Sequence, residues 1–264
     1  MYGAIIGDIC GSIYEYEKFK TDNPGEIPLI DSRCFYTDDT VLTCATIDAL
    51  LKKRNYKKAA YRWANDYPGR GYGKKFVLWC TSLFPRPYNS FGNGSAMRVS
   101  GIGWAFETIE ETLSEAKRSS EITHNHPEGI KGAEATAAAI FLAREGNNKE
   151  IIKKCIEDTF GYNLQRTLKD IRPNYTYDLS CQGTVPEAII AFLESNDFTG
   201  AIQNAISLGG DSDTLACITG GIAEAYYKKI PEELITFANR ALCKDMVKLL
   251  EKFYQEYDIV TEFF

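Results

Sequence analysis

The sequence predicts one all-α domain of ten or more helices. Apolar residues recur at helical spacing along most of the 264-residue chain. No alternation of apolar and polar residues, the pattern of a half-buried strand, continues over a useful length. There is also no repeat, no low-complexity segment and no linker that divides the chain. We therefore expect residues 1–264 to form a single helical domain.

The composition is that of an ordinary globular protein, with 44% hydrophobic and 25% charged residues. The net charge of −6 argues against general nucleic-acid binding. The N-terminus has no basic region before Asp8, so no signal peptide is expected. No apolar run approaches the roughly 18 residues of a membrane span. We expect a cytoplasmic monomer with no membrane partner.

The eight cysteines form no CxxC pair, and the chain has only two histidines. We expect buried thiols in a reducing compartment and no zinc site.

The first helix is expected over residues 3–16, where Gly3, Gly7 and Gly11 recur on one face. Glycine inside a helix costs roughly 1 kcal/mol relative to alanine, which suggests that another element approaches this face closely. Residues 21–28 contain two prolines and a glycine and should form a loop.

The next helix is expected from Thr37 to about Leu51, with Lys52, Lys53 and Arg54 at the C-terminal end, where the helix dipole favours cations. Two shorter helices should follow at 56–66 and 74–83, separated by a glycine-rich loop. Proline, asparagine and glycine dominate residues 84–95, which predicts another loop.

Helices are then expected over 95–106, 110–122, 128–145 and 148–159, and the apolar run 134–142 should be central. Residues 161–183 support no assignment. Thr184 with Pro186 and Glu187 indicates a helix start with proline in the first turn. The last helices are expected at 197–208, 212–228, 231–241 and 243–257, and Gly220-Gly221 again predicts tight packing.

Two expected helix starts carry a surplus of acidic side chains, Thr37-Asp38-Asp39-Thr40 and Asp211-Ser212-Asp213-Thr214. Simple N-capping is one interpretation, because Asp and Ser are favoured there. A cap uses only one oxygen, however, and adjacent carboxylates repel each other unless a cation lies between them. Four carboxylates and two hydroxyls suit Mg²⁺, Mn²⁺ or Ca²⁺. We predict that the fold brings both segments together around a metal site.

Other residues leave alternatives open. Glu15 could be a general acid/base, a ligand or a solvated surface charge. The loop 89–95 could cradle a phosphate at a helix N-terminus, with Phe91 stacked on a base, although Gly-Asn-Gly is also a common turn. Arg98 could contact a phosphate or form an ordinary ion pair. For His124 and His126, a capping or hydrogen-bonding role is the simpler interpretation.

Five segments, in order, resemble the ADP-ribosylglycohydrolase family. They are Gly3-Ala4-Ile5-Ile6-Gly7-Asp8-Ile9-Cys10-Gly11-Ser12-Ile13-Tyr14-Glu15, Thr37-Asp38-Asp39-Thr40, Gly92-Asn93-Gly94-Ser95-Ala96-Met97-Arg98-Val99, Thr123-His124 and Gly209-Gly210-Asp211-Ser212-Asp213-Thr214. The resemblance covers residues 3 to about 227. It implies a single compact orthogonal multi-helix domain, two divalent cations (Mg²⁺ or Mn²⁺) and hydrolysis of the glycosidic bond between ADP-ribose and an acceptor. The product is free ADP-ribose, and an ADP-ribosylated protein or another ADP-ribosylated acceptor is the expected partner.

The resemblance also implies roles for individual residues. Glu15 matches a catalytic glutamate. The metal ligands implied are Thr37, Asp38, Asp39, Asp211, Asp213 and Thr214. The substrate-binding residues implied are Ser90, Phe91, Gly92, Asn93, Gly94, Ser95 and His124, with Phe91 stacked on adenine.

The segment Gly11-Ser12-Ile13-Tyr14-Glu15 is closer to the branch of the family that removes ADP-ribose from serine. The dinitrogenase-reductase-activating relatives use an extra aspartate in the middle loop, where this chain has Asn89 and Asn93. This difference argues against their arginine mechanism.

Two other functions stay open. The family resemblance includes invertebrate lens crystallins, so a non-catalytic ADP-ribose-binding or structural protein is the main alternative. A Mg²⁺-dependent phosphohydrolase acting on nucleotides is the third, and the absence of a P-loop and of histidine ligands argues against it. The sequence identifies neither the acceptor nor the metal.

Overall fold

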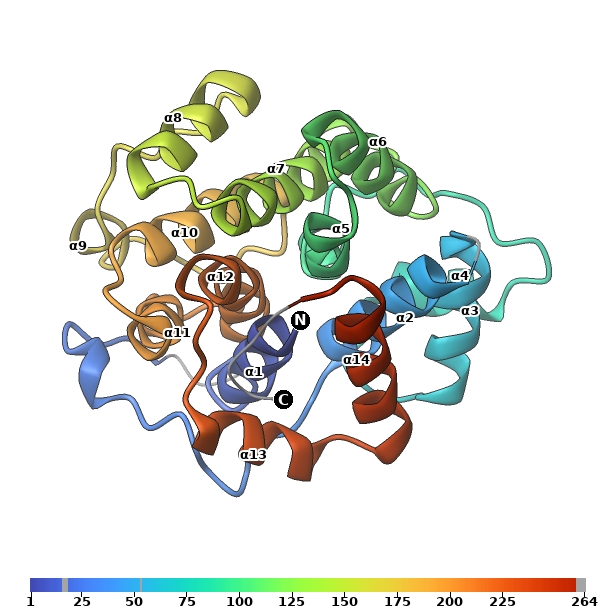
Figure 1. Ribbon diagram of the computed structural model, residues 1–264, viewed down its shortest axis with the longest axis horizontal. Helices are drawn as coiled ribbons and strands as arrows, with labels where there is room; N and C mark the ends of the chain where they lie inside the picture. Colours follow the sequence, from blue (N-terminus) through green and yellow to red (C-terminus); the bar gives the residue numbers. More distant parts are fainter. Residues whose placement is uncertain (16–18, 53, 260–264) are drawn as a thin grey trace.

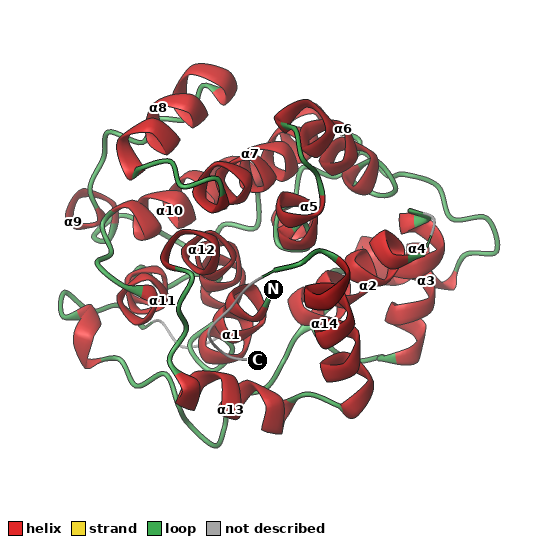
Figure 2. Cartoon of the chain, viewed as in Figure 1, coloured by secondary structure: helices red, strands yellow, loops and turns green. Residues whose placement is uncertain are grey.

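The computed structural model describes residues 1–15, 19–52 and 54–259. Within these ranges the chain forms fourteen α-helices and two short 3₁₀ helices, with no β-strand (Figure 2), which confirms the all-α prediction. The helices are α1 (Tyr2–Gly11), η1 (Pro24–Glu26), α2 (Asp38–Leu51), α3 (Tyr56–Asp66), α4 (Lys74–Thr81), η2 (Asn93–Ser95), α5 (Ser100–Ala105), α6 (Ile109–Ser120), α7 (Pro127–Arg144), α8 (Lys149–Phe160), α9 (Leu168–Ile171), α10 (Cys181–Leu193), α11 (Phe198–Ser207), α12 (Ser212–Tyr227), α13 (Glu232–Ala241) and α14 (Lys244–Glu256).

Helices α1 and α12 pack side by side at the centre of the fold (Figure 1). Every residue of α1 is buried, as is all of α12 except its C-terminal end. A Cβ atom added to Gly3 would lie 2.2 Å from the carbonyl oxygen of Gly220, and one added to Gly7 would lie 2.0 Å from that of Ala216. The two backbones therefore touch, which confirms the close approach expected from the glycine spacing.

The other helices surround this central pair. Helix α7 packs against α5, α6, α8, α10 and α12, so the apolar run 134–142 is central as expected. Helices α11 and α13 contact α1, and α2 packs against α3, α5 and α14. Helices α2 and α12 both contact α1 and also contact each other. Their first turns lie close together, since the Thr214 hydroxyl is within hydrogen-bond distance of Asp39.

Several expected helix boundaries are wrong. Helix α1 ends at Gly11, and residues 12–15 form turns, so the helix expected to Tyr16 is too long. Tyr16 itself and the expected C-terminal cation Lys53 lie outside the described residues. Helix α4 ends at Thr81, two residues earlier than expected.

The helix expected over 95–106 is also wrong. A 3₁₀ turn at Asn93–Ser95 and an irregular segment precede α5, which begins only at Ser100. The carbonyl oxygen of Met97 accepts hydrogen bonds from the Thr43 hydroxyl at 3.3 Å and the Cys217 thiol at 3.4 Å. Contacts with α2 and α12 thus take the place of regular helical bonding here.

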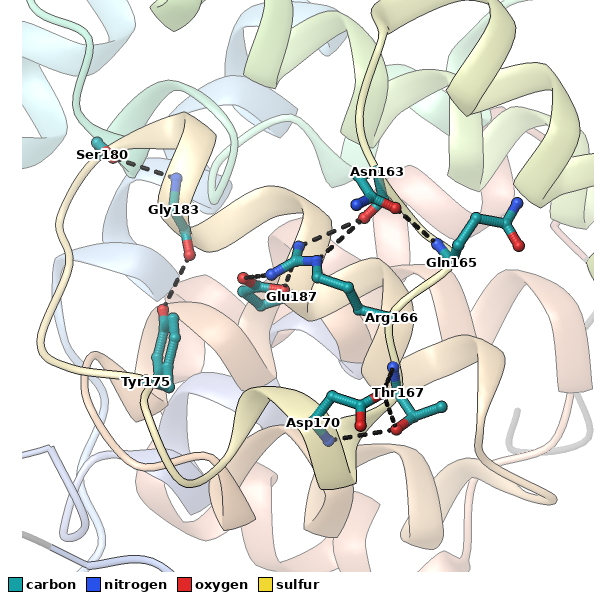
Figure 3. Close-up of polar contacts among 9 residues, drawn as sticks. All are labelled: Asn163, Gln165, Arg166, Thr167, Asp170, Tyr175, Ser180, Gly183 and Glu187. Atoms are coloured by element: carbon teal, nitrogen blue, oxygen red, sulfur yellow. Dashed lines mark hydrogen bonds and ion pairs between the residues drawn. The ribbon is translucent and has the colours of Figure 1, made fainter.

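The sequence supports no assignment for the segment 161–183. In the structure, hydrogen bonds of its side chains fix its path (Figure 3). Arg166 forms two hydrogen bonds with the Glu187 carboxylate, at 2.7 and 2.9 Å. Thr167 and Asp170 form a capping box that starts the short helix α9. Helix α10 begins at Cys181, three residues before the expected start, because the Ser180 hydroxyl accepts from the Gly183 N–H and caps it.

All eight cysteines are free thiols. Five are buried, as expected, whereas Cys34, Cys155 and Cys243 are only partly buried. Among the described helices, none combines the length and the apolar character that crossing a bilayer requires.

We predict that Gly7→Ala lowers the free energy of unfolding by about 2 kcal/mol or more, because the new methyl group overlaps the backbone of α12, which cannot move aside. Gly25→Ala is the matched control, since a Cβ at Gly25 meets nothing within 4 Å. Urea denaturation of both variants measures the difference. Equal stability of the two variants would show that the α1–α12 contact is looser than described.

Candidate active site

A cleft of about 600 Å³ opens where α2 and α12 begin. Twelve of the fourteen residues proposed from the sequence line it: Glu15, Thr37, Asp38, Asp39, Ser90, Gly92, Asn93, Gly94, His124, Asp211, Asp213 and Thr214. Phe91 and Ser95 are not among the lining residues. The fold thus gathers segments between residues 15 and 214 into one cleft.

The two acidic segments meet inside this cleft. The Thr214 hydroxyl lies 3.3 Å from Asp39 Oδ2, within hydrogen-bond distance, although the two residues are 175 positions apart in the sequence. Each segment lies at a helix N-terminus, where the helix dipole favours negative charge. The fold therefore brings together the residues that the sequence proposed as one set.

Asp8 of α1 fixes the start of α2. Its carboxylate accepts hydrogen bonds from the backbone N–H groups of Thr37 and Thr40, both at 3.0 Å, and from both threonine hydroxyls. The Thr37 hydroxyl in turn accepts from the Asp39 N–H and caps α2. Asp8 is fully buried, and the sequence analysis did not identify it as part of the site.

Glu15, Asp211 and Asp213 each place a carboxylate oxygen within 4.8 Å of the others. Gly209 and Gly210 both have positive φ, which turns the chain sharply before Asp211. Asp211 occupies the N-cap position of α12 but makes no capping hydrogen bond. The capping interpretation therefore applies to Thr37 and not to Asp211, whose carboxylate faces the cleft.

The pKa values of the four aspartates reflect the unfavourable energy of burying several carboxylates close together. Burial, and then the nearby aspartates, raise the pKa of Asp38, Asp39 and Asp213 well above the usual range. Burial raises the pKa of Asp211 to about 6. Among the ion pairs of the described residues, none includes these four carboxylates.

The donor set fits a divalent cation. Asp39 Oδ1 is buried without a hydrogen-bond partner, although buried carboxylate oxygens are normally satisfied. The surrounding groups are carboxylate and hydroxyl oxygens, the ligands that Mg²⁺ and Mn²⁺ prefer. Among the described residues, Glu15, Asp211 and Asp213 bring carboxylate oxygens close enough together to hold such an ion.

The glycine-rich turn forms the adjacent wall of the cleft. The N–H of Gly92 donates to the Ser90 hydroxyl at 3.1 Å, and the N–H of Asn93 donates to the Leu179 carbonyl at 2.8 Å. These two amides are therefore not free to bind a phosphate. The Asn93 side chain donates to Asp211 instead, and so connects the turn to the acidic cluster.

Phe91 and Ser95 lie outside the cleft lining. The Phe91 ring is 49% exposed and meets the His126 ring edge-on at 5.4 Å between centroids. Ser95 is fully buried, and its hydroxyl donates to the Gly129 carbonyl at 2.7 Å. His126 caps α7 by accepting from the Glu128 N–H, which agrees with the simpler interpretation of that residue.

The sequence analysis also missed Tyr177. Its hydroxyl donates to Glu15 Oε1 at 2.6 Å, and its ring lines the cleft. Tyr177 lies in the segment 161–183, which has no helical pattern, so nothing in the sequence identified it. Positive charge in the cleft was also missed: Arg70 in the loop before α4 and Lys74 and Lys75 at the start of α4 line the cleft.

Comparison with known proteins gives consistent results. The family model described as ADP-ribosylglycohydrolase matches residues 1–259. The human protein named ADP-ribosylhydrolase ARH3 is 27% identical over 309 aligned positions, covering 87% of this chain and 85% of that protein. A Pseudomonas putida protein named ADP-ribosylarginine hydrolase Tri1 is 25% identical, covering 86% of this chain and 69% of its own. A solved structure titled ADP-ribosylglycohydrolase-related protein complex superposes with a TM-score of 0.72 at 25% identity, covering 97% of this chain and 95% of that one.

We predict that Mg²⁺ or Mn²⁺ raises the melting temperature and that EDTA reverses the rise. An ion at 100 times its Kd stabilises the folded state by about 2.7 kcal/mol. Asp39→Asn should abolish this metal-induced shift while leaving the metal-free protein at least as stable, because it removes one of several crowded buried charges.

Asp48→Asn is the matched control on the same helix. Asp48 is equally buried but pairs with Lys52 and Arg62, outside the cleft. Its baseline stability should fall and its metal-induced shift should remain. A full shift in Asp39→Asn would contradict the proposed site.

Proposed function

Because the chain belongs to the ADP-ribosylglycohydrolase family, we propose that it hydrolyses the glycosidic bond between ADP-ribose and an acceptor and releases free ADP-ribose. The observation that carries this proposal is the meeting of the two acidic segments in one cleft, where Thr214 approaches Asp39 within hydrogen-bond distance. The cleft, at about 600 Å³, is large enough for a nucleotide sugar.

The proposed metal ligands are Thr37, Asp38, Asp39, Asp211, Asp213 and Thr214. A divalent cation held by these residues would polarise a water molecule or a ribose hydroxyl and lower its pKa. Asp8 maintains the set from α1, because it fixes the backbone at Thr37 and Thr40. Asn93 orients Asp211 through its amide N–H.

The proposed catalytic residue is Glu15. Its Oε1 already accepts a hydrogen bond from Tyr177, so we assign proton transfer to Oε2. The carboxylates around the reacting carbon would stabilise the positive charge that develops there as the glycosidic bond breaks. Tyr177 holds Glu15 in place through this hydrogen bond.

The acceptor is the open part of this proposal. The relatives carry names that include an arginine-directed enzyme, whereas the Gly-Ser-Ile-Tyr-Glu segment resembles the serine-directed branch. We propose a serine-linked substrate. Incubation with serine-linked, arginine-linked and nucleic-acid-linked ADP-ribose, with and without EDTA, identifies the acceptor. Tight binding of ADP-ribose without turnover of any substrate would support the non-catalytic alternative instead.

We predict that Glu15→Gln lowers kcat by roughly 10²- to 10⁴-fold, the usual contribution of a general acid or base. ADP-ribose affinity, measured by calorimetry, should stay close to the wild-type value. The matched control is Glu26→Gln, because Glu26 is exposed and lies outside the cleft. Full turnover in Glu15→Gln would remove Glu15 from its assigned role.

Tyr177→Phe should lower kcat by roughly 10- to 150-fold and change KM little, because a hydrogen bond to a charged group contributes roughly 1.5–3 kcal/mol. Tyr61→Phe serves as the control, since Tyr61 lies on α3 against Trp79, away from the cleft. Steady-state kinetics on the same substrate compares the two variants. An equal effect of both substitutions would show that Tyr177 does not act through Glu15.

A further inference from the structure

Arg98 is the largest fully buried side chain and has no acidic partner among the ion pairs of the described residues. Its Nη2 donates instead to the carbonyl oxygen of Ser119 and to the Thr123 hydroxyl, both at 3.0 Å. Ser119 lies in the last turn of α6, where the helix dipole is negative. The Arg98 charge is thus stabilised by a carbonyl and a hydroxyl oxygen, so the ordinary ion pair considered from the sequence is not formed among the described residues. Arg98 also lines the cleft, and its contact with a phosphate stays a prediction.

The Thr123 hydroxyl connects Arg98 to His124. Arginine can only donate, so Thr123 Oγ1 accepts from Arg98. The same oxygen lies 2.7 Å from His124 Nδ1. A hydroxyl has a single proton, and Nδ1 is the acceptor within reach among the described residues. A proton directed at Nδ1 requires this nitrogen to be unprotonated, whereas an Nδ1–H group would donate to the second lone pair of the Thr123 oxygen.

An imidazole that accepts at Nδ1 carries its proton on Nε2. A doubly protonated ring would turn an N–H toward the Thr123 oxygen and leave the hydroxyl proton without an acceptor. It would also place a second positive charge beside Arg98. Consistently, burial and then the Arg98 charge lower the pKa of His124 well below its usual range.

The Nε2 atom lies beside the glycine-rich turn. A Cβ atom at Gly94 would come within 3.3 Å of it, and one at Gly92 within 3.5 Å. His124 lines the cleft, and no hydrogen bond of the described residues uses its Nε2. The ring therefore presents a free N–H group toward the cleft at a point where glycine leaves room for a ligand.

We propose that Arg98 and Thr123 are positioning residues that hold His124 as the neutral Nε2–H tautomer, so that the cleft offers a hydrogen-bond donor to an acceptor oxygen of the bound ligand. The tautomer can be tested on the free protein alone. That the ligand oxygen belongs to the phosphates or riboses of ADP-ribose rests on the proposed function. A donor without a charge would bind such an oxygen without adding a cation beside the carboxylates.

The tautomer is measured by long-range ¹H–¹⁵N correlation on protein labelled with ¹⁵N-histidine, at pH 7.5. With only two histidines in the chain, the spectrum is simple, and His126→Asn assigns it, since Asn is also a good N-cap residue. The expected result is an Nε2–H ring for His124. An Nδ1–H ring or an imidazolium in the wild-type protein overturns the proposal, whatever the variants do.

Thr123→Val removes the hydroxyl and keeps the shape. We expect its His124 spectrum to change to a mixture of tautomers and its Kd for ADP-ribose to rise about 5- to 10-fold, the loss of one hydrogen bond. Thr123→Ser should restore both values. Thr136→Val is the matched control, because Thr136 is equally buried and its hydroxyl has no partner. An unchanged His124 spectrum in Thr123→Val also overturns the proposal.

The His124 spectrum tests the tautomer, and the Kd for ADP-ribose tests the proposed function, so the two hypotheses can fail independently. If wild-type protein fails to bind ADP-ribose, the proposed function fails, while the spectrum of the free protein still decides the tautomer. If Thr123→Val does not fold, the wild-type and Thr123→Ser spectra decide it.

Discussion

The backbone contact between α1 and α12 is the constraint on which the site depends. At the C-terminal end of α1, a Cβ at Gly11 would lie 2.6 Å from the Cα of Asp213, and the Ser212 hydroxyl donates to the Gly11 carbonyl at 3.0 Å. One turn earlier, Asp8 binds the start of α2. A single buried helix therefore positions both acidic segments, and any wider spacing of α1 and α12 would move Asp213 away from Asp39.

The four aspartates of the site destabilise the folded protein. Four aspartates with raised pKa values lie within one depression, and burial is the main cause of the shift in each case. Buried like charges repel each other, so favourable packing and hydrogen bonds in the surrounding structure must offset this repulsion. The hydrogen bonds that Asp8 and Asn93 make and the tight α1–α12 contact supply that rigidity. Function and folding are thus coupled through the same few residues.

The sequence was informative where local rules decide the structure. Helix α3 was predicted with its observed bounds, 56–66, and the surplus of acids at two helix starts identified residues that the fold does bring together. It failed where tertiary contacts decide. The carbonyl of Met97 is bound by Thr43 and Cys217, which interrupts a helical pattern. Tyr177 reaches Glu15 from a segment with no periodicity, and only the path of that loop brings it there.

Two arginines that line the cleft form contacts with groups other than the acidic cluster. Arg70 stacks on the Tyr36 ring at 3.9 Å and donates to its hydroxyl, so its charge is directed away from the aspartates. Arg98 is bound to the carbonyl end of α6, and through Thr123 it disfavours a second cation at His124. A charged His124 beside the turn that carries Asn93 would partly neutralise Asp211 and weaken the attraction for a divalent ion. Arg70 and Arg98 are thus engaged by groups other than the carboxylates, while Lys74 and Lys75 also line the cleft. Under the proposed function, a neutral His124 would leave more of the negative charge of the cluster available to a divalent cation.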